Sequence, residues 1–281
     1  MRAHILIGAV SALTVAATAG AAQAATKLEI KDAVARVTVI PEARSDVKVE
    51  VVKRHPGLPM DLRVNGDTVE VDGNLGRNAI RGCVTVNDKT RVNVRRVGTI
   101  NFDDMPQLIV RTPMDANVRV GGAVFGEVRP SYSLEFSNVG CGNWRLADTR
   151  GLLELKQAGS GDVQAGRSGG LEIRVAGSGD VAAGPVATRL SVEIAGSGDV
   201  EVASVNGDIE TRIAGSGDIA VLGGRAPRME AHIAGSGDIS FRGVAGSLQA
   251  NIAGSGGIHA DQVDGPVERH VMGSGEVTVG R

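Results

Sequence analysis

Aromatic residues are scarce in this sequence. Its 281 positions hold one Trp, one Tyr and four Phe, against 40 Gly. Enzyme cores and sugar-stacking grooves normally use more aromatic surface than this. The scarcity argues against both, and favours thin layers of Val, Ile, Leu and Ala that are joined by tight turns.

An excess of charge of one sign is also absent. Lys and Arg together number 30, and Asp and Glu number 32, so the formal net charge at pH 7 is −2 with neutral His. Nucleic-acid-binding domains usually carry a strongly basic face. The balance of charge argues against a nucleic-acid partner.

Cysteine is nearly absent, since Cys83 and Cys141 are the only two in the chain. Two cysteines without paired CxxC or HxxxH spacing cannot fill a tetrahedral metal site, so we expect no metal centre. In an oxidising compartment a single disulfide between them is the simplest interpretation, and two buried free thiols are the alternative. The chain-entropy model gives such a bridge about 4 kcal/mol of stabilisation.

Residues 1–24 have the layout of a secretory signal peptide. An apolar run extends from Ile5 to Ala19, and the small-residue triplet Ala22-Gln23-Ala24 closes the segment. The run falls short of the roughly 20 residues that span a membrane, which disfavours an N-terminal anchor. We therefore expect export, cleavage after Ala24, no membrane span in the mature chain, and residence in the periplasm or at the cell surface.

One short motif recurs through the second half of the chain. The triplet Gly-Ser-Gly begins at Gly159, Gly177, Gly196, Gly215, Gly235, Gly254 and Gly273. The residue after each triplet is acidic in six of the seven copies, the exception being Gly257, and the next is always Val or Ile. The first five acids are Asp162, Asp180, Asp199, Asp218 and Asp238. A repeat of about 19 residues predicts a stacked architecture.

The residues before each triplet alternate with the period of two that is typical of a strand, as in Leu171-Glu172-Ile173-Arg174-Val175. Stacking the repeats aligns two inward ladders. The first is Leu153, Leu171, Leu190, Ile209, Met229, Leu248 and Val267, and the second is Val175, Ile194, Ile213, Ile233, Ile252 and Val271. Such short strands cannot bury their apolar face alone, so neighbouring rungs must supply the core.

These patterns predict an all-β chain folded as a parallel β-helix (β-solenoid) with about 19 residues per rung, and right-handed because parallel crossovers coil that way. Gly at each corner supplies backbone angles that other residues avoid. The Asp side chains can accept hydrogen bonds from turn amides, so we interpret them as a structural turn ladder.

We divide the chain into a signal peptide (1–24), irregular N-terminal rungs with a cap (25–150), and the regular GSGD-repeat β-helix (151–281). In the middle segment, strand-like runs continue between turn signals such as Asn65-Gly66-Asp67. A separate small β-domain is the alternative, although no linker is evident.

With the Gly-Ser-Gly-Asp-Val/Ile ladder in view, the chain resembles the putative auto-transporter adhesin head GIN domain family of bacterial envelope proteins. The resemblance is strongest from Gly159 to Val279, while Arg81-Gly82-Cys83 and Gly140-Cys141-Gly142-Asn143-Trp144 look like segments of proteobacterial members. It implies a right-handed β-helix and an exported location. The adhesin label is itself an inference from the fold and adds little about the ligand.

Motifs of common catalytic classes are missing. No Gly-Lys-Ser/Thr follows the glycines, and each repeat Ser lies in GSG instead of GxSxG. A polysaccharide-active β-helix enzyme, a lyase or glycosidase, is the enzymatic alternative, but it needs an irregular cluster of acids in a groove. A calcium-dependent solenoid is the other alternative. Calcium-binding β-roll repeats have a period of about nine residues, which does not match.

We therefore expect a non-catalytic exported cell-envelope protein, an adhesin-like structural or binding module with a repetitive β-helix surface and no catalytic, cofactor or metal site. Its partner would be an envelope protein or glycan, and the ends of a solenoid also allow end-to-end self-association. The chain stops at Arg281 directly after the last repeat, so an adhesin role would need another anchor or a partner.

Overall fold

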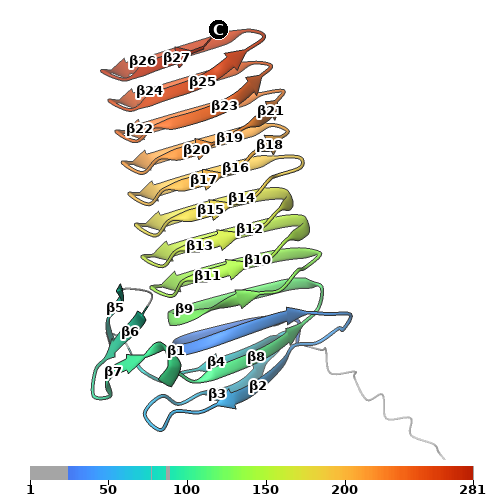
Figure 1. Cartoon of the computed structure of the whole chain (residues 1–281), viewed down its shortest axis with the longest axis vertical. Coiled ribbons are helices and arrows are strands. Elements are labelled where there is room, and N and C mark those ends of the chain that lie inside the picture. Colours follow the sequence, from blue (N-terminus) through green and yellow to red (C-terminus); the bar gives the residue numbers. More distant parts are fainter. Residues whose placement is uncertain (1–24, 77, 87–88, 281) are drawn as a thin grey trace, which may run out of the picture.

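The computed structural model describes residues 25–76, 78–86 and 89–280, so the expected signal peptide lies outside the described residues. The chain is a β-solenoid of about nine turns with about 19 residues per turn (Figure 1). The one helical element in the described part is the short 3-10 helix η1 (Phe102–Asp104). The prediction of an all-β solenoid and its rung length is confirmed. At three residues, η1 is far shorter than a membrane-spanning helix, so the described residues contain no candidate span of that kind.

The column consists of short strands that pair in parallel with the strands one turn below and above. In chain order they are β9 (Asp115–Val128), β10 (Ser133–Gly140), β11 (Trp144–Leu146), β12 (Thr149–Gly159), β13 (Val163–Ala165), β14 (Ser168–Gly177), β15 (Val181–Ala183), β16 (Leu190–Gly196), β17 (Val200–Val202), β18 (Val205–Asn206), β19 (Ile209–Gly215), β20 (Ile219–Val221), β21 (Gly224–Ala226), β22 (Met229–Gly235), β23 (Ile239–Ala245), β24 (Leu248–Gly254), β25 (Gly257–Val263), β26 (Val267–Gly273) and β27 (Glu276–Val279).

The base of the column is closed by strands from the first part of the chain. The long strand β1 (Lys27–Pro41) pairs in parallel with β9 above it, and with β4 (Thr68–Asp72) and β8 (Gln107–Thr112) below it. Beyond these, β2 (Lys48–Lys53) and β3 (Asp61–Asn65) run antiparallel to β8 and β4. The change of direction ends the parallel stack and forms a cap.

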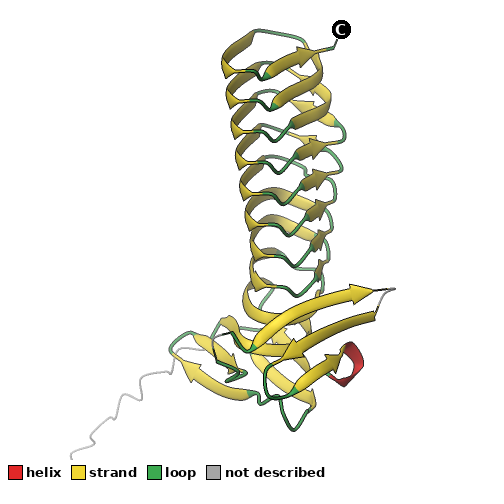
Figure 2. Cartoon of the chain, turned by 90° about the vertical axis from the view of Figure 1, so that its left-hand side faces the viewer, coloured by secondary structure: helices red, strands yellow, loops and turns green. Residues whose placement is uncertain are grey.

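A second, smaller sheet stands beside the base (Figures 1 and 2). It is antiparallel and contains β5 (Ile80–Val86), β6 (Lys89–Val94) and β7 (Gly98–Asn101). Val92 and Val94 of this side sheet belong to an apolar cluster that also contains Val34 of β1 and Phe125 of β9. The side sheet is thus packed against the column through its own small core.

The inward ladders predicted from the repeat form the core. From Leu153 to Leu248, members of the first ladder are at most 2% exposed, and from Val175 to Ile252 members of the second are at most 3% exposed. The top rung differs, because Val271 is 41% exposed and Val267 is partly buried. Val271 keeps the predicted ladder register with Ile252, but it is not buried because no described strand covers β26.

A charged residue occupies an inward column of this last rung. Arg269 is aligned with Ala250, and below it with Ala231 and Thr211, all three of which are fully buried. Inward-pointing charges on an edge strand oppose pairing with another edge. This bears on the expected end-to-end self-association, which would have to cover Arg269.

Close contact between rungs explains the two glycines of each triplet. Gly196 has a φ of 147°, and a Cβ at this residue would lie 2.2 Å from the carbonyl oxygen of Gly177. A Cβ at Gly198 would lie 2.3 Å from the carbonyl oxygen of Gly179. Any side chain at either corner position would therefore force adjacent turns apart.

The same corner begins two turns earlier than the first Gly-Ser-Gly. Gly140 is the register partner of Gly159, and Gly122 is the partner of Gly140. Both have positive φ, 151° and 109°. The segment Gly140-Cys141-Gly142-Asn143-Trp144 is therefore a variant of the repeat, in which Cys, Asn and Trp replace Ser, Asp and Val.

Candidate ligand-binding site

The Asp ladder lies along one corner of the column, and each of its carboxylates accepts a hydrogen bond from the rung above. Backbone N–H groups donate to Oδ1 of the preceding Asp at 3.2 Å (Asp180 to Asp162), 2.9 Å (Asp199 to Asp180), 2.9 Å (Asp218 to Asp199), 2.8 Å (Asp238 to Asp218) and 2.6 Å (Gly257 to Asp238). The partner is thus the amide of the next rung, so the ladder connects successive turns.

Asn143 begins this ladder and Gly257 ends it. The Asp162 N–H donates to Oδ1 of Asn143 at 3.0 Å. Gly257 donates its amide but has no carboxylate to offer, and the Glu276 N–H bonds to the backbone oxygen of Gly256 instead, at 3.3 Å. Among the described residues, no group of three or more His, Cys, Asp or Glu is arranged to hold a metal ion.

We expect Asp199→Ala to lower the free energy of unfolding by about 1 kcal/mol, because it removes one inter-rung hydrogen bond at an exposed corner. Asp199→Asn keeps the acceptor oxygen and should cost less. Urea unfolding of the two variants and the parent measures the difference. If the carboxylates served as calcium ligands instead, millimolar calcium would raise the melting temperature of the parent above its value in EDTA, contrary to our expectation of equal values.

A disulfide joins the side sheet to the column. It links Cys83 of β5 to Cys141, with 6.0 Å between the two Cα atoms and 58 residues of sequence separation. Cys141 stands at the Ser position of the variant triplet, two residues before Asn143. The bridge therefore fixes the side sheet next to the corner where the Asp ladder begins.

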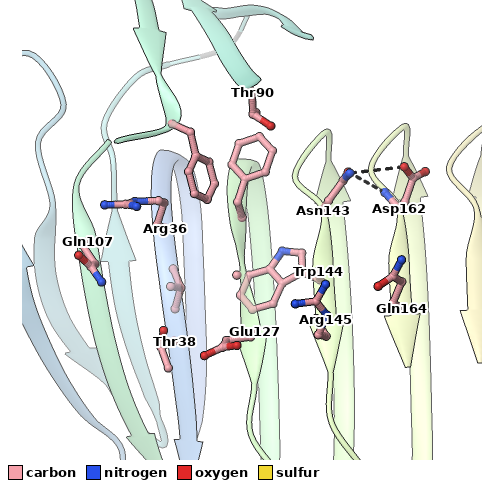
Figure 3. Close-up of a pocket in the computed structure, with 14 residues that line it drawn as sticks. Arg36, Thr38, Thr90, Gln107, Glu127, Asn143, Trp144, Arg145, Asp162 and Gln164 are labelled. Carbon is pink, nitrogen blue, oxygen red and sulfur yellow. Dashed lines mark hydrogen bonds between the residues drawn. The ribbon is translucent and has the colours of Figure 1, made fainter. Parts of the chain in front are cut away.

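A cavity of about 480 Å³ lies where the side sheet and η1 meet the column (Figure 3). Its floor is the outer face of β8, β1, β9, β11 and β13, which are neighbours in the sheet. Two rows of side chains cross these strands. The first row is Gln107, Arg36, Phe125, Asn143 and Asp162, and the second includes Thr38, Glu127, Arg145 and Gln164. Phe102 of η1 and Thr90 of β6 line the side. We call this cavity the base groove.

Four of the six aromatic residues gather at or beneath the base groove. The rings of Phe102 and Phe125 meet edge to face with 5.8 Å between centroids. Beneath the floor, Trp144 packs on Phe136 at 4.9 Å and donates its indole N–H to the Val124 carbonyl at 2.7 Å. The scarcity of aromatic residues in the whole chain, which argued against an aromatic groove, does not extend to this place.

A glycine makes room for the indole. Gly126 is the register partner of Trp144, and a Cβ at Gly126 would lie 2.9 Å from the Trp144 ring. The large residue on one rung thus fills the space that the glycine leaves on the rung below. The floor of the base groove is consequently packed to a fixed shape.

Arginine side chains in the base groove keep hydrogen-bonding capacity, whereas its carboxylates are already engaged. The Arg36 guanidinium lies 5.0 Å from the centroid of Phe102, and its Nε is buried without a hydrogen-bond partner among the described residues. Glu127 forms an ion pair with Arg129 at 2.9 Å, and Asp162 belongs to the ladder. The Arg145 side chain is exposed and has no hydrogen-bond or ion-pair partner among the described residues, and its register neighbour Glu127 is paired with Arg129.

The regular outer face of the column differs from the base groove, because its charges pair with one another. Arg189 lies 2.6 Å from the carboxylate of Glu210 in β19. Arg212, also in β19, forms a second ion pair with this carboxylate. Hydrogen bonds from Arg212 and then Arg189 hold the pKa of Glu210 below its usual value. These exposed pairs make a solvated surface and contribute little stability.

The structure thus defines a class of protein, a capped β-solenoid with a groove between its base and a disulfide-linked side sheet. The chain belongs to the family described as "Putative auto-transporter adhesin, head GIN domain", whose family model matches residues 61–225 and 205–280. The resemblance inferred from the Gly-Ser-Gly-Asp repeats is confirmed.

One solved structure that this chain matches is that of a putative adhesin from Parabacteroides distasonis ATCC 8503. The alignment covers 92% of this chain and 94% of that one, with 16% sequence identity and a TM-score of 0.46. No curated protein matches this sequence.

The base groove contains residues that the sequence alone did not single out. Arg36 of β1, Phe102 of η1 and Arg145 of β11 lie far apart in sequence, and they line one groove because β1 pairs with β8 on one side and β9 on the other. The sequence did predict the disulfide between Cys83 and Cys141. The five predicted ladder residues share one corner, and Asp162 among them also lines the groove.

Proposed function

We propose that this protein is a non-catalytic, exported, adhesin-like module that binds an envelope ligand in the base groove. Membership of the adhesin head family supports the adhesin-like description. A disulfide is typical of proteins in an oxidising compartment, which supports export. The observation that carries the proposal is the base groove itself, because ligand sites are concave and combine aromatic surface with a few polar groups.

The groove is prepared for binding by the elements around it. The disulfide and the apolar cluster that contains Val92 and Phe125 hold the side sheet in place. The floor strands are paired on both sides within the column. A site that is rigid before the ligand arrives loses less conformational entropy on binding.

The arrangement supports binding over glycoside hydrolysis. A glycosidase needs two carboxyl groups that flank the scissile bond and are free to act as acid, base or nucleophile. The two acids in the base groove have other partners, since Glu127 pairs with Arg129 and Asp162 accepts the Asp180 amide. A ligand would meet arginine, amide and hydroxyl groups, together with two carboxylates that already have partners.

Binding of the labelled, purified protein to isolated bacterial envelopes tests the proposal. We expect saturable binding, and a loss of affinity of at least about tenfold in Phe102→Ala, because aromatic anchors dominate binding energy. Phe102 is 37% exposed on the wall of the groove. Tyr132→Ala is the matched control, since Tyr132 is 57% exposed and does not line the groove.

Equal loss of binding in both variants, or in neither, would contradict a role for the base groove. Treating the envelopes with periodate or with protease before binding separates a glycan ligand from a protein ligand. Release of shortened sugars from purified polysaccharide by the parent protein would contradict the non-catalytic assignment and favour the enzymatic alternative.

A further inference from the structure

We infer that the base groove binds an acidic saccharide, and that Arg36 and Arg145 each bind a sugar carboxylate or hydroxyl group of it. This inference rests on the proposed function and names the chemical class of its ligand. It follows from the unmatched hydrogen-bond donors of the groove, from the spacing of its polar side chains, and from the pairing of its floor strands.

The arginine side chains of the base groove have more unpaired N–H donors than its carboxylates have unpaired acceptor oxygens. Arg36 forms one ion pair among the described residues, from Nη1 to the highly exposed Asp103 at 3.5 Å, and its Nη2 has no partner there; its Nε is buried and also has none. The exposed Arg145 side chain has no hydrogen-bond or ion-pair partner among the described residues. Because both acids of the groove are engaged, the missing complement is an anion with acceptor oxygens, and the planar guanidinium matches a carboxylate in particular.

Phe102 restricts the position of one of these arginines. Its ring lies against the Arg36 guanidinium at 5.0 Å, a cation–π arrangement that orients the plane of the guanidinium. Less side-chain entropy is then lost when an anion binds. Phe102 would therefore both contact the ligand and orient the Arg36 guanidinium.

The spacing of the polar side chains fits an extended ligand. Arg36 on β1 and Arg145 on β11 are separated by β9, which places their strands about 10 Å apart. Gln107 and Gln164 extend the polar rows over five neighbouring strands, or about 19 Å. Amide and hydroxyl groups both donate and accept hydrogen bonds, as sugar hydroxyls do. The ligand would therefore lie along the column axis.

Two other kinds of ligand suit the groove less well. A peptide that adds a strand needs an unpaired sheet edge, but β1, β9 and β11 each have partners on both sides. A nucleic acid needs many phosphate contacts from a basic surface, whereas this chain has a net charge of −2.

Calorimetric titration with short acidic oligosaccharides tests the inference, using oligogalacturonate, oligomannuronate and hyaluronan fragments as probes. Cello-oligosaccharides of equal length are the neutral controls. We expect at least one acidic probe to bind, neutral probes to bind at least about tenfold more weakly, and affinity to fall when NaCl is raised from about 0.05 to 0.5 M. Arg145→Gln should weaken binding of the acidic probe at least about tenfold, since it removes a charged donor.

Arg174→Gln is the matched control, because Arg174 is an exposed arginine on the regular face of the column. Its binding of the acidic probe should equal that of the parent. Melting curves establish that both variants are folded. Arg36→Gln then provides a second variant, with loss of binding expected at an unchanged melting transition of the column.

Equal binding of acidic and neutral probes, or binding that Arg145→Gln leaves unchanged, would overturn the inference. So would a lack of binding to all three acidic probes by the folded parent. In each of these cases the proposed function still stands if Phe102→Ala, and not Tyr132→Ala, loses binding to envelopes. If no variant affects envelope binding, the proposed function fails as well.

Discussion

Replacing Ile213 by Asp should lower the free energy of unfolding by about 4 kcal/mol or more, since it removes a core side chain and buries a carboxylate. Ile213 is 2% exposed, and its register partners on the turns below and above are Ile194 and Ile233. Neither neighbour can pair with a charge. Each turn depends on the next for its core, so the damage should spread to adjacent rungs. Urea unfolding followed by circular dichroism measures the loss.

Arg212→Asp is the control on the same strand. Its side chain is 52% exposed and points outward beside Glu210, so the new charge stays in water. We expect a cost of at most about 1 kcal/mol. Similar unfolding midpoints for Ile213→Asp and Arg212→Asp would show that the inward and outward faces are assigned wrongly.

Removing the disulfide should have an effect of similar size, but at the base of the column. The double variant Cys83→Ser, Cys141→Ser should lose about 4 kcal/mol, because the bridge closes a long loop in the unfolded chain. Serine at position 141 also restores the Gly-Ser-Gly triplet of the other turns, so this corner should lose little besides the bridge. Urea unfolding of parent and variant, both without reductant, measures the difference.

Two controls test whether the loss of stability comes from the disulfide. Dithiothreitol should lower the stability of the parent and leave the double variant unchanged. Mass mapping without reduction should recover a peptide that links Cys83 to Cys141. Finding both thiols free in natively exported protein, or a stability loss below about 1 kcal/mol, would contradict a stabilising bridge.

The regular part of the fold could be predicted from the sequence because repetition makes the pattern explicit. Leu171 and Leu190 occupy equivalent places in consecutive turns, and the register of β14 with β16 pairs them as expected. The hydrogen-bond partner of each Asp was harder to predict. A carboxylate at a corner can reach an amide of its own turn or of the next one, and only the rise between turns decides which.

The start of the stack and the base groove could not be predicted in the same way. Three substitutions in Gly140-Cys141-Gly142-Asn143-Trp144 hide its equivalence to Gly-Ser-Gly-Asp-Val, although its 19-residue distance from Gly159 was a usable signal. The groove depends on β1, which pairs with two strands that are distant in sequence. Non-local pairing of this kind leaves no periodic trace, so the placement of Arg36 and Arg145 in one groove becomes visible only in three dimensions.

The contact of each turn with only its two neighbours makes the column an adjustable spacer. Adding or deleting one unit of about 19 residues near β19 would move the open end by about 4.8 Å and leave Arg36, Phe102 and Arg145 undisturbed. The length of the column and the binding residues of the base groove can therefore change independently of each other. Evolution or engineering can change the distance between the groove and whatever the far end touches in whole-turn increments, without redesigning the groove.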